Sequence, residues 1–148
     1  MLSSYLLRDN WRETGFSLVE VGEIIRRKGV LAGYDVVAEY PIKTKGDRRS
    51  IDWVWLKGDA VVLAIEIEGC NAPRKSIQGD IEKFTNITRS AKFKPYCLIV
   101  TYSRRYTKDR GWVKLKSKAD RIKSYLQGAE LSVLDDIFML ESLDALKF

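Results

Sequence analysis

Residues 50–68 read SIDWVWLKGDAVVLAIEIE, and this stretch says most about the fold and the function. Two runs rich in β-branched and aromatic residues flank Lys57-Gly58-Asp59, which predicts two antiparallel strands over 50–56 and 60–68. Three acidic residues, Asp52, Glu66 and Glu68, interrupt these otherwise apolar runs. Carboxylates in a buried strand lose hydration and repel one another, so they need a positive charge nearby, and a divalent cation would serve.

The register of this hairpin decides whether the three acids meet. Glu66 and Glu68 share one face because side chains alternate along a strand. A two-residue turn would pair Asp52 with Ile65 and place the acids on opposite faces. A three-residue loop, or an equivalent bulge, pairs Lys57 with Val61, Val54 with Ala64 and Asp52 with Glu66. We favour this odd register because directly opposite Cβ atoms lie about 4.5–5.5 Å apart, which lets two carboxylates share one cation.

The alternative interpretation of the acids is structural. Asp52 would then form a salt bridge with Arg49 or Lys83, and the two glutamates would face water on an edge strand. Each acid taken alone favours this alternative. Their occurrence together, in one hairpin between two predicted helices, favours a cation site.

The other elements are predicted outward from the hairpin. Apolar periodicity predicts helices over 16–28, 74–88 and 114–126, and apolar runs predict strands over 34–40 and 96–102. We expect Asn10 or Thr14 to cap the first helix, Gly29 to end it, and Pro41 to end the next strand. Segments 131–134 and 137–140 fit one more strand or a final helix. This order predicts an α/β (α+β) fold, a mixed sheet flanked by helices, in one domain spanning 1–148.

The sequence contains no histidine, which excludes zinc fingers with His ligands, HNH nucleases and histidine-based hydrolases. Hydrolytic chemistry would therefore use carboxylates and lysines. Carboxylate oxygens are hard ligands that favour Mg²⁺ or Mn²⁺ over zinc. Cys70 and Cys97 lie at the edges of apolar segments and are expected to be buried free thiols. No segment has the pattern of a membrane helix or a signal peptide, so we expect a cytoplasmic, intracellular protein.

Positive charge is concentrated in one region of the chain. The formal net charge is +6 and the pI is about 9.3. Residues 103–123 hold nine basic residues against two acidic ones. The candidates for nucleic-acid binding in this region are Arg104, Arg105, Lys108, Arg110, Lys114, Lys116, Lys118 and Lys123. Tyr102, Tyr106 and Trp112 are interleaved with them, which indicates a polyanion-binding surface; a solvated face is the alternative.

The pattern Ile51-Asp52 followed by Ala64-Ile65-Glu66-Ile67-Glu68 resembles the core of the PD-(D/E)XK nuclease superfamily. This superfamily includes restriction endonucleases, archaeal Holliday-junction resolvases and small viral and archaeal nucleases. Its core of helix, three antiparallel strands, helix and strand matches residues 16–102, roughly the first two thirds of the chain. The resemblance implies a restriction-endonuclease-like fold and Mg²⁺- or Mn²⁺-dependent hydrolysis of phosphodiester bonds, with DNA as the expected substrate.

The sequence departs from the family pattern at two positions. Ile51 replaces the proline of the family name, at a variable position. Glu68 replaces the lysine that usually helps to orient and activate water, although some restriction endonucleases also carry Glu there. Lys75 and Lys83 are candidates to supply the missing cation. A helical wheel, however, turns both lysines away from the apolar stripe of their helix.

The resemblance also implies roles for individual residues. Asp52 and Glu66 would hold the metal, with the Ile67 carbonyl as a further ligand. Glu20, on the first helix, would complete the site; a solvated helix glutamate is the alternative. Glu68 would accept a proton from water or hold a second metal. The competing hypotheses are a non-catalytic nucleic-acid-binding module on the same scaffold and, third, a protein–protein adaptor. A single domain of this size would act as a homodimer to cut both strands.

Overall fold

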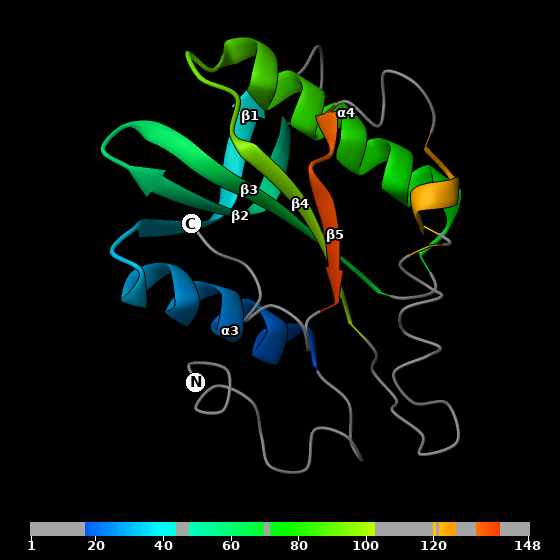
Figure 1. The fold of residues 1–148 in the computed structure, drawn as a ribbon, viewed down its shortest axis with the longest axis horizontal. Helices are drawn as coiled ribbons and strands as arrows, with labels where there is room; N and C mark the ends of the chain where they lie inside the picture. Colours follow the sequence, from blue (N-terminus) through cyan, green and yellow to red (C-terminus); the bar gives the residue numbers. More distant parts are fainter. Residues whose placement is uncertain are drawn as a thin grey trace.

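The computed structural model describes residues 17–43, 48–69, 72–102, 120, 122–126 and 133–139. They form a mixed α/β fold, a five-stranded sheet of order β1-β2-β3-β4-β5 with helices on its faces (Figure 1). The strands are β1 (Asp35–Lys43), β2 (Arg48–Lys57), β3 (Ala60–Gly69), β4 (Tyr96–Tyr102) and β5 (Asp136–Met139). The first three are antiparallel neighbours, whereas β4 is parallel to β3 and β5 to β4. The mixed sheet predicted from the sequence is confirmed.

Two helices, α3 (Leu18–Leu31) and α4 (Arg74–Ser90), cover opposite faces of the sheet (Figure 1). Their buried residues belong to two separate cores, with Val21, Ile24 and Ile25 of α3 in one and Ile77, Ile81 and Phe84 of α4 in the other. Parallel strands need a crossover connection, and α4 supplies it between β3 and β4. The inner side of α4 therefore faces the strand that carries both glutamates.

The start and the end of α3 follow from local chemistry. Ser17 is the N-cap: its hydroxyl accepts a hydrogen bond from the Glu20 N–H, and the Glu20 carboxylate accepts one from the Ser17 N–H. The helix continues through Gly29, so the prediction that Gly29 ends it is wrong. A Cβ at Gly29 would lie 2.8 Å from the Trp55 ring, so the glycine permits close packing of helix on sheet. Gly33, with φ +89°, follows the helix instead.

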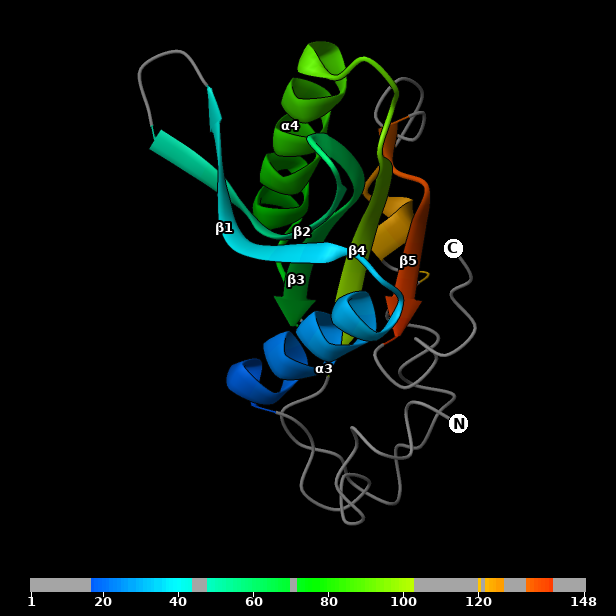
Figure 2. The same ribbon diagram turned by 90° about the vertical axis from the view of Figure 1, so that its left-hand side faces the viewer.

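The prediction that Pro41 ends the first strand is also wrong, because β1 continues to Lys43. Proline is tolerated here because β1 is an edge strand, where a missing N–H costs no ladder hydrogen bond. The strand bends sharply along its length (Figure 2), and Glu39 within it has a φ of +49°. Both Ile51 and Val54 of β2 belong to the core beneath α4. Residues three apart in a straight strand point to opposite faces, so this arrangement is expected only where the strands bend.

A bulge gives the β2–β3 hairpin its odd register. The pairs are Lys57–Ala60, Leu56–Val61, Trp55–Leu63 and Val54–Ala64. The predicted pair of Lys57 with Val61 is therefore wrong, because the turn has two residues. Val62 is the extra residue that shifts the register between Trp55 and Leu56. The predicted pair of Val54 with Ala64 is confirmed, so the parity that brings Asp52 to the side of the glutamates is present.

The C-terminal part of the chain is described only in part. Residues 136–139 form β5, so the tail supplies a strand. Of the helix predicted over 114–126, residues 122–124 are helical, and Ile122 and Leu126 are buried beneath α4. Cys97 is a buried free thiol, as expected. The prediction that Asn10 or Thr14 caps the first helix is wrong, because Ser17 is its N-cap. The predictions for Cys70 and for residues 103–119 concern positions outside the described residues. Within the described ranges no helix is long and apolar enough to cross a membrane.

Candidate functional site

Glu66 lies at the centre of the candidate site, on the face of β3 that α4 covers. Its side chain is only 2% exposed. Along the edge of β3 that pairs with β4, Glu66 is in register with Ile99. Since β3 is the central strand of the sheet, the backbone of Glu66 is held in its middle. A carboxylate so deeply buried costs free energy unless it binds a proton or a cation.

Asp52 reaches Glu66 from the neighbouring strand. The backbone ladder between β2 and β3 ends at Trp53 and Ile65. Beyond that point the Asp52 Oδ2 accepts a hydrogen bond of 2.8 Å from the Ile67 N–H, which fixes the aspartate beside β3. The expected backbone pair of Asp52 with Glu66 is thus replaced by this side-chain contact. Burial first, and then the adjacent Asp52 carboxylate, raise the pKa of Glu66 to about 9.

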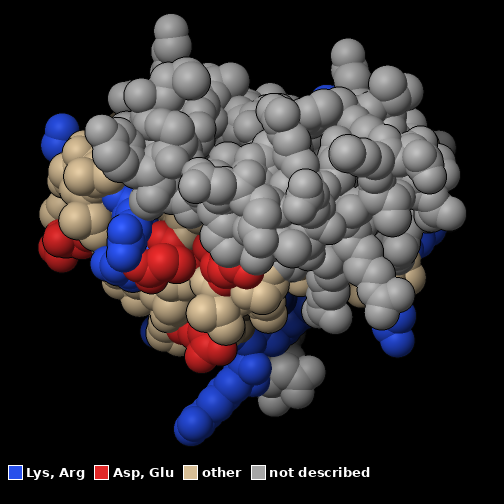
Figure 3. Space-filling model, turned by 90° about the horizontal axis from the view of Figure 1, so that it is seen from below, with Lys and Arg blue, Asp and Glu red and all other residues tan. Residues whose placement is uncertain are grey.

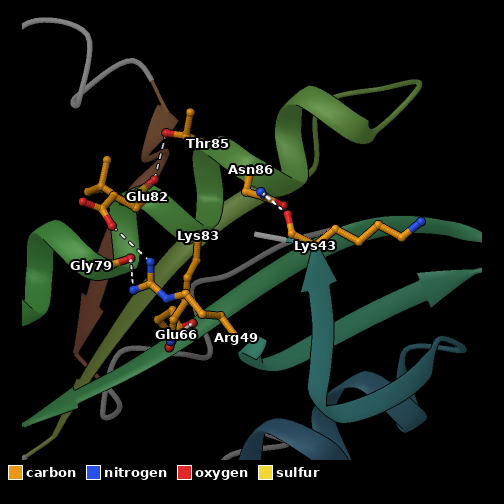
Figure 4. A network of polar contacts seen from close by, with 9 residues as sticks. Lys43, Arg49, Glu66, Gly79, Glu82, Lys83, Thr85 and Asn86 are labelled. Atoms are coloured by element: carbon orange, nitrogen blue, oxygen red, sulfur yellow. Dashed lines mark hydrogen bonds and ion pairs between the residues drawn. The ribbon is translucent and has the colours of Figure 1, made fainter. Parts of the chain in front are cut away.

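Lys83 of α4 reaches down to Glu66, as Figure 4 shows. Its Nζ lies 3.1 Å from the Glu66 Oε1, and the lysine side chain is 19% exposed. The contact is an ion pair whose geometry is not that of a hydrogen bond, because the same Oε1 has no hydrogen-bond partner. The expectation that Lys83 turns away from the sheet is therefore wrong. Lysine is long enough to reach from the edge of the apolar stripe to the strand below.

Asp80 is a fourth acid at the site, which the sequence analysis missed. It lies on the inner side of α4 and is 4% exposed. Burial first, and then contact with the Glu68 carboxylate, raise the pKa of Asp80, and Glu66 adds to the rise. The signal in the sequence was its position: Asp80 comes three residues after Ile77 and directly before Ile81, inside the apolar stripe. Asp52 thus neighbours Glu66, and Glu66 and Glu68 both neighbour Asp80. We call these four residues the acid cluster.

The acid cluster holds more negative charge than its lysine can neutralise. Lys83 supplies a positive charge to Glu66 and Asp80, and the other neighbours of these two carboxylates, Asp52 and Glu68, are acidic. Lys83 opposes the rise in the pKa of Glu66, but burial and Asp52 outweigh it. On the exposed surface, by comparison, the described acidic and basic side chains lie beside one another in the view from below (Figure 3). The cluster must therefore take up either protons or a further cation at neutral pH.

Arg49 braces the site from β2. Its guanidinium lies 3.0 Å from Glu82 of α4 and also reaches the Gly79 carbonyl at 3.5 Å (Figure 4). The alternative in which Asp52 pairs with Arg49 is thus wrong, since Arg49 is engaged with α4. Gly79 is the residue before Asp80. The contacts of Arg49 therefore hold the turn of α4 that carries Asp80 and Lys83.

The remaining predicted site residues do not gather here. Lys75 is exposed in the first turn of α4. Glu20 lies at the start of α3, on the opposite side of the sheet from α4, where it completes the capping box with Ser17. Of the predicted nucleic-acid-binding residues, Lys123 is exposed, and Arg104, Arg105, Lys108, Arg110, Lys114, Lys116 and Lys118 lie outside the described residues.

The donor set of the acid cluster fits a hard divalent cation. Two carboxylate oxygens in it, Glu66 Oε1 and Asp80 Oδ2, are buried without a hydrogen-bond partner. Oxygen donors of this kind suit Mg²⁺ or Mn²⁺. As the described side chains are placed, no three acidic or cysteine residues lie close enough together to hold a metal ion. Binding a cation thus requires these carboxylates to turn toward a common point, and their repulsion is the force that a cation would relieve.

No protein-family model matches the sequence, and no curated protein matches it significantly.

The raised pKa of Glu66 predicts how stability depends on pH. In the metal-free folded protein Glu66 keeps its proton up to about pH 9, whereas the unfolded chain releases it near 4.5. The folded state thus binds more protons between these values, and Glu66 makes the free energy of unfolding fall as pH rises, by at most about 1.4 kcal/mol per pH unit. Asp80, whose pKa is also raised, adds to this fall. We expect urea unfolding in EDTA to show this fall between pH 6 and 8.5.

Saturating Mg²⁺ should remove the slope, because a cation favours the ionised carboxylate. Glu66→Gln should remove the share of the slope that Glu66 contributes, and the share from Asp80, whose pKa is also raised, should remain. A wild-type slope unchanged by Mg²⁺ would argue against cation binding at Glu66.

Proposed function

We propose that this protein is a Mg²⁺- or Mn²⁺-dependent nuclease of the PD-(D/E)XK type, acting on DNA. The observation that carries the proposal is the buried Glu66, with Asp52 fixed beside it and Lys83 3.1 Å away. Buried carboxylates and a lysine converging on one strand end are costly to stability, and such groups concentrate at functional sites. A restriction-endonuclease-like fold is part of the proposal, supported by the order of helix, three antiparallel strands, helix and parallel strand.

In this proposal Asp52 and Glu66 hold the metal, with the Ile67 carbonyl as a further ligand. When bound, Mg²⁺ would supply an activated water and neutralise charge on the scissile phosphate. The Ile67 N–H keeps the Asp52 carboxylate in place before any ligand arrives. Lys83, which reaches the site from α4, would take the role of the lysine that the family carries at the position of Glu68, and would donate to the phosphate or to the attacking water. Glu68, which contacts Asp80, takes up the proton that the water loses.

The test is cleavage of supercoiled plasmid and of circular single-stranded DNA in Mg²⁺, Mn²⁺ or EDTA. We expect metal-dependent nicking that Asp52→Asn abolishes, since an asparagine oxygen still accepts the Ile67 N–H but lacks the charge. Asp35→Asn, an exposed aspartate on β1, is the matched control and should cut like the wild type. A chain that binds DNA without cutting it under any metal would support the alternative, a non-catalytic binding module.

Glu68→Ala should lower the rate of cleavage by about 100-fold or more, because a proton acceptor is lost. Glu68→Gln should weaken cleavage severely. Glu68→Lys should abolish it, since it adds a positive charge beside the metal even though it restores the usual family residue. The measurement is the rate of plasmid nicking at saturating Mg²⁺. Wild-type cleavage by Glu68→Ala would show that Glu68 has no role in the reaction.

A further inference from the structure

A groove of about 780 Å³ lies at the C-terminal end of α4. The end of β1, the β2–β3 turn and the residues that follow α4 form its walls. The lining residues important here are Tyr40, Lys43, Asp59, Arg89, Lys92 and Phe93. Its volume is in the range of ligand-binding clefts, about 300–1,000 Å³.

The groove carries positive charge that the described residues do not neutralise. Lys43, Arg89 and Lys92 line it, against the single carboxylate of Asp59. None of the three cations forms an ion pair with another described residue, whereas Arg49, only a few residues from Lys43, is engaged by Glu82. The groove is therefore complementary to an anion with several charges.

An exposed aromatic ring stands beside these cations. Phe93 is 74% exposed, although burying a phenylalanine gains about 1.5–3 kcal/mol. The Lys92 Nζ lies 5.8 Å from the centre of its ring, so a cation and an apolar surface face the same space. A ligand that fits both has flat apolar faces and negative charges a short distance from them.

The groove is shaped before any ligand binds. The Asn86 side-chain amide of α4 donates a hydrogen bond to the Lys43 carbonyl, which ties the end of β1 to the helix (Figure 4). The Lys43 side chain extends away from Asn86. The two walls are thus linked, while the cationic head group stays available.

We propose that this groove binds an unpaired nucleic-acid strand, with a base stacked on Phe93 and phosphates held by Lys43, Arg89 and Lys92. Single-strand sites combine a cationic groove with aromatic side chains, because an unpaired base offers a free face. The inference rests on the proposed nuclease function and names the form of its substrate. Arg89 comes six residues after Lys83 on α4, about 9 Å along the helix axis, so the bound strand extends to the acid cluster within a few nucleotides.

The test is fluorescence anisotropy with a labelled oligothymidine and with a duplex of the same length, in EDTA so that binding is independent of cleavage. Phe93→Ala should weaken single-strand binding by about 5- to 150-fold and leave duplex binding nearly unchanged. Lys43→Ala, Arg89→Ala and Lys92→Ala should each reduce the slope of log affinity against log salt by about 0.7. Leu31→Ala and Arg27→Ala on α3, both exposed in the wild type, are the controls and should bind like it.

The two proposals fail in different ways. If the groove variants bind the single strand like the wild type, or if the wild type does not bind it, the groove proposal is overturned, whatever the cleavage assay shows. If the groove variants lose single-strand binding while no metal supports cleavage, the groove proposal stands and the nuclease proposal falls. Equal losses on single strand and duplex would also overturn the groove proposal, since a duplex offers no free base face to Phe93.

Discussion

Glu66→Gln is expected to abolish metal-dependent cleavage, by about 100- to 1,000-fold or more, and at the same time to stabilise the metal-free protein. The loss follows because glutamine keeps the shape of the side chain but cannot balance the charge of a cation. The gain follows because the wild-type carboxylate, 2% exposed, must take up a proton to stay buried at pH 8. We expect a gain of about 1–3 kcal/mol in the free energy of unfolding in EDTA.

Plasmid nicking and urea unfolding measure the two effects on the same preparation. Glu23→Gln is the matched control, because Glu23 is a half-exposed glutamate on α3 that pairs with Arg26 and Arg27. It should leave cleavage unchanged and should not stabilise the protein. Full activity in Glu66→Gln would remove Glu66 from the reaction, and a loss of stability would show that its charge serves the fold.

Lys83→Ala is expected to separate catalysis from cation binding. Cleavage should fall by about 100-fold or more, because the ammonium beside the reacting phosphate is lost. Mn²⁺ should bind as tightly as before or more tightly. Burial raises the pKa of Glu66 most, and Lys83 is the positive charge that opposes this rise and competes with a cation for the carboxylate. Calorimetric titration with Mn²⁺ and single-turnover cleavage rates measure the two effects.

Lys83→Arg should recover part of the rate, since it keeps the charge but not the geometry. Lys57→Ala, an exposed lysine at the hairpin end of β2, is the control and should change neither measurement. If Lys83→Ala loses Mn²⁺ binding and cleavage together, the lysine is structural and the proposed role is wrong.

The register of the central hairpin could be predicted from the sequence because chemistry and alternation agree there. Placing Asp52 and Glu66 on one side required an odd register, and the structure pairs Val54 with Ala64 accordingly. How the chain reaches this register could not be predicted. A two-residue turn alone would place Asp52 and Glu66 on opposite faces, and a bulge at Val62 supplies the extra residue that brings them to one face. Bulge positions depend on packing across the sheet, which local sequence does not record.

The acid cluster was only partly predictable for a similar reason. Asp80 does not stand out in the sequence because apolar residues, Ile77, Ile81 and Phe84, define the buried stripe of α4, and a helical pattern does not show which distant acids a carboxylate among them contacts. Lys83 was misplaced because a wheel gives the direction of Cβ and not the reach of a long side chain. A glycine late in a helical pattern predicts the end of the helix, whereas Gly29 makes room for Trp55, a contact between distant segments.

Anomalous diffraction from crystals soaked in Mn²⁺ would show whether the acid cluster binds a divalent cation. We expect an anomalous peak at the end of β3, with oxygens of Asp52 and Glu66 about 2.1 Å from it, and no such peak in Asp52→Asn crystals. Crystals that bind Mn²⁺ elsewhere, or that show no peak between these two carboxylates at saturating Mn²⁺, would contradict the account.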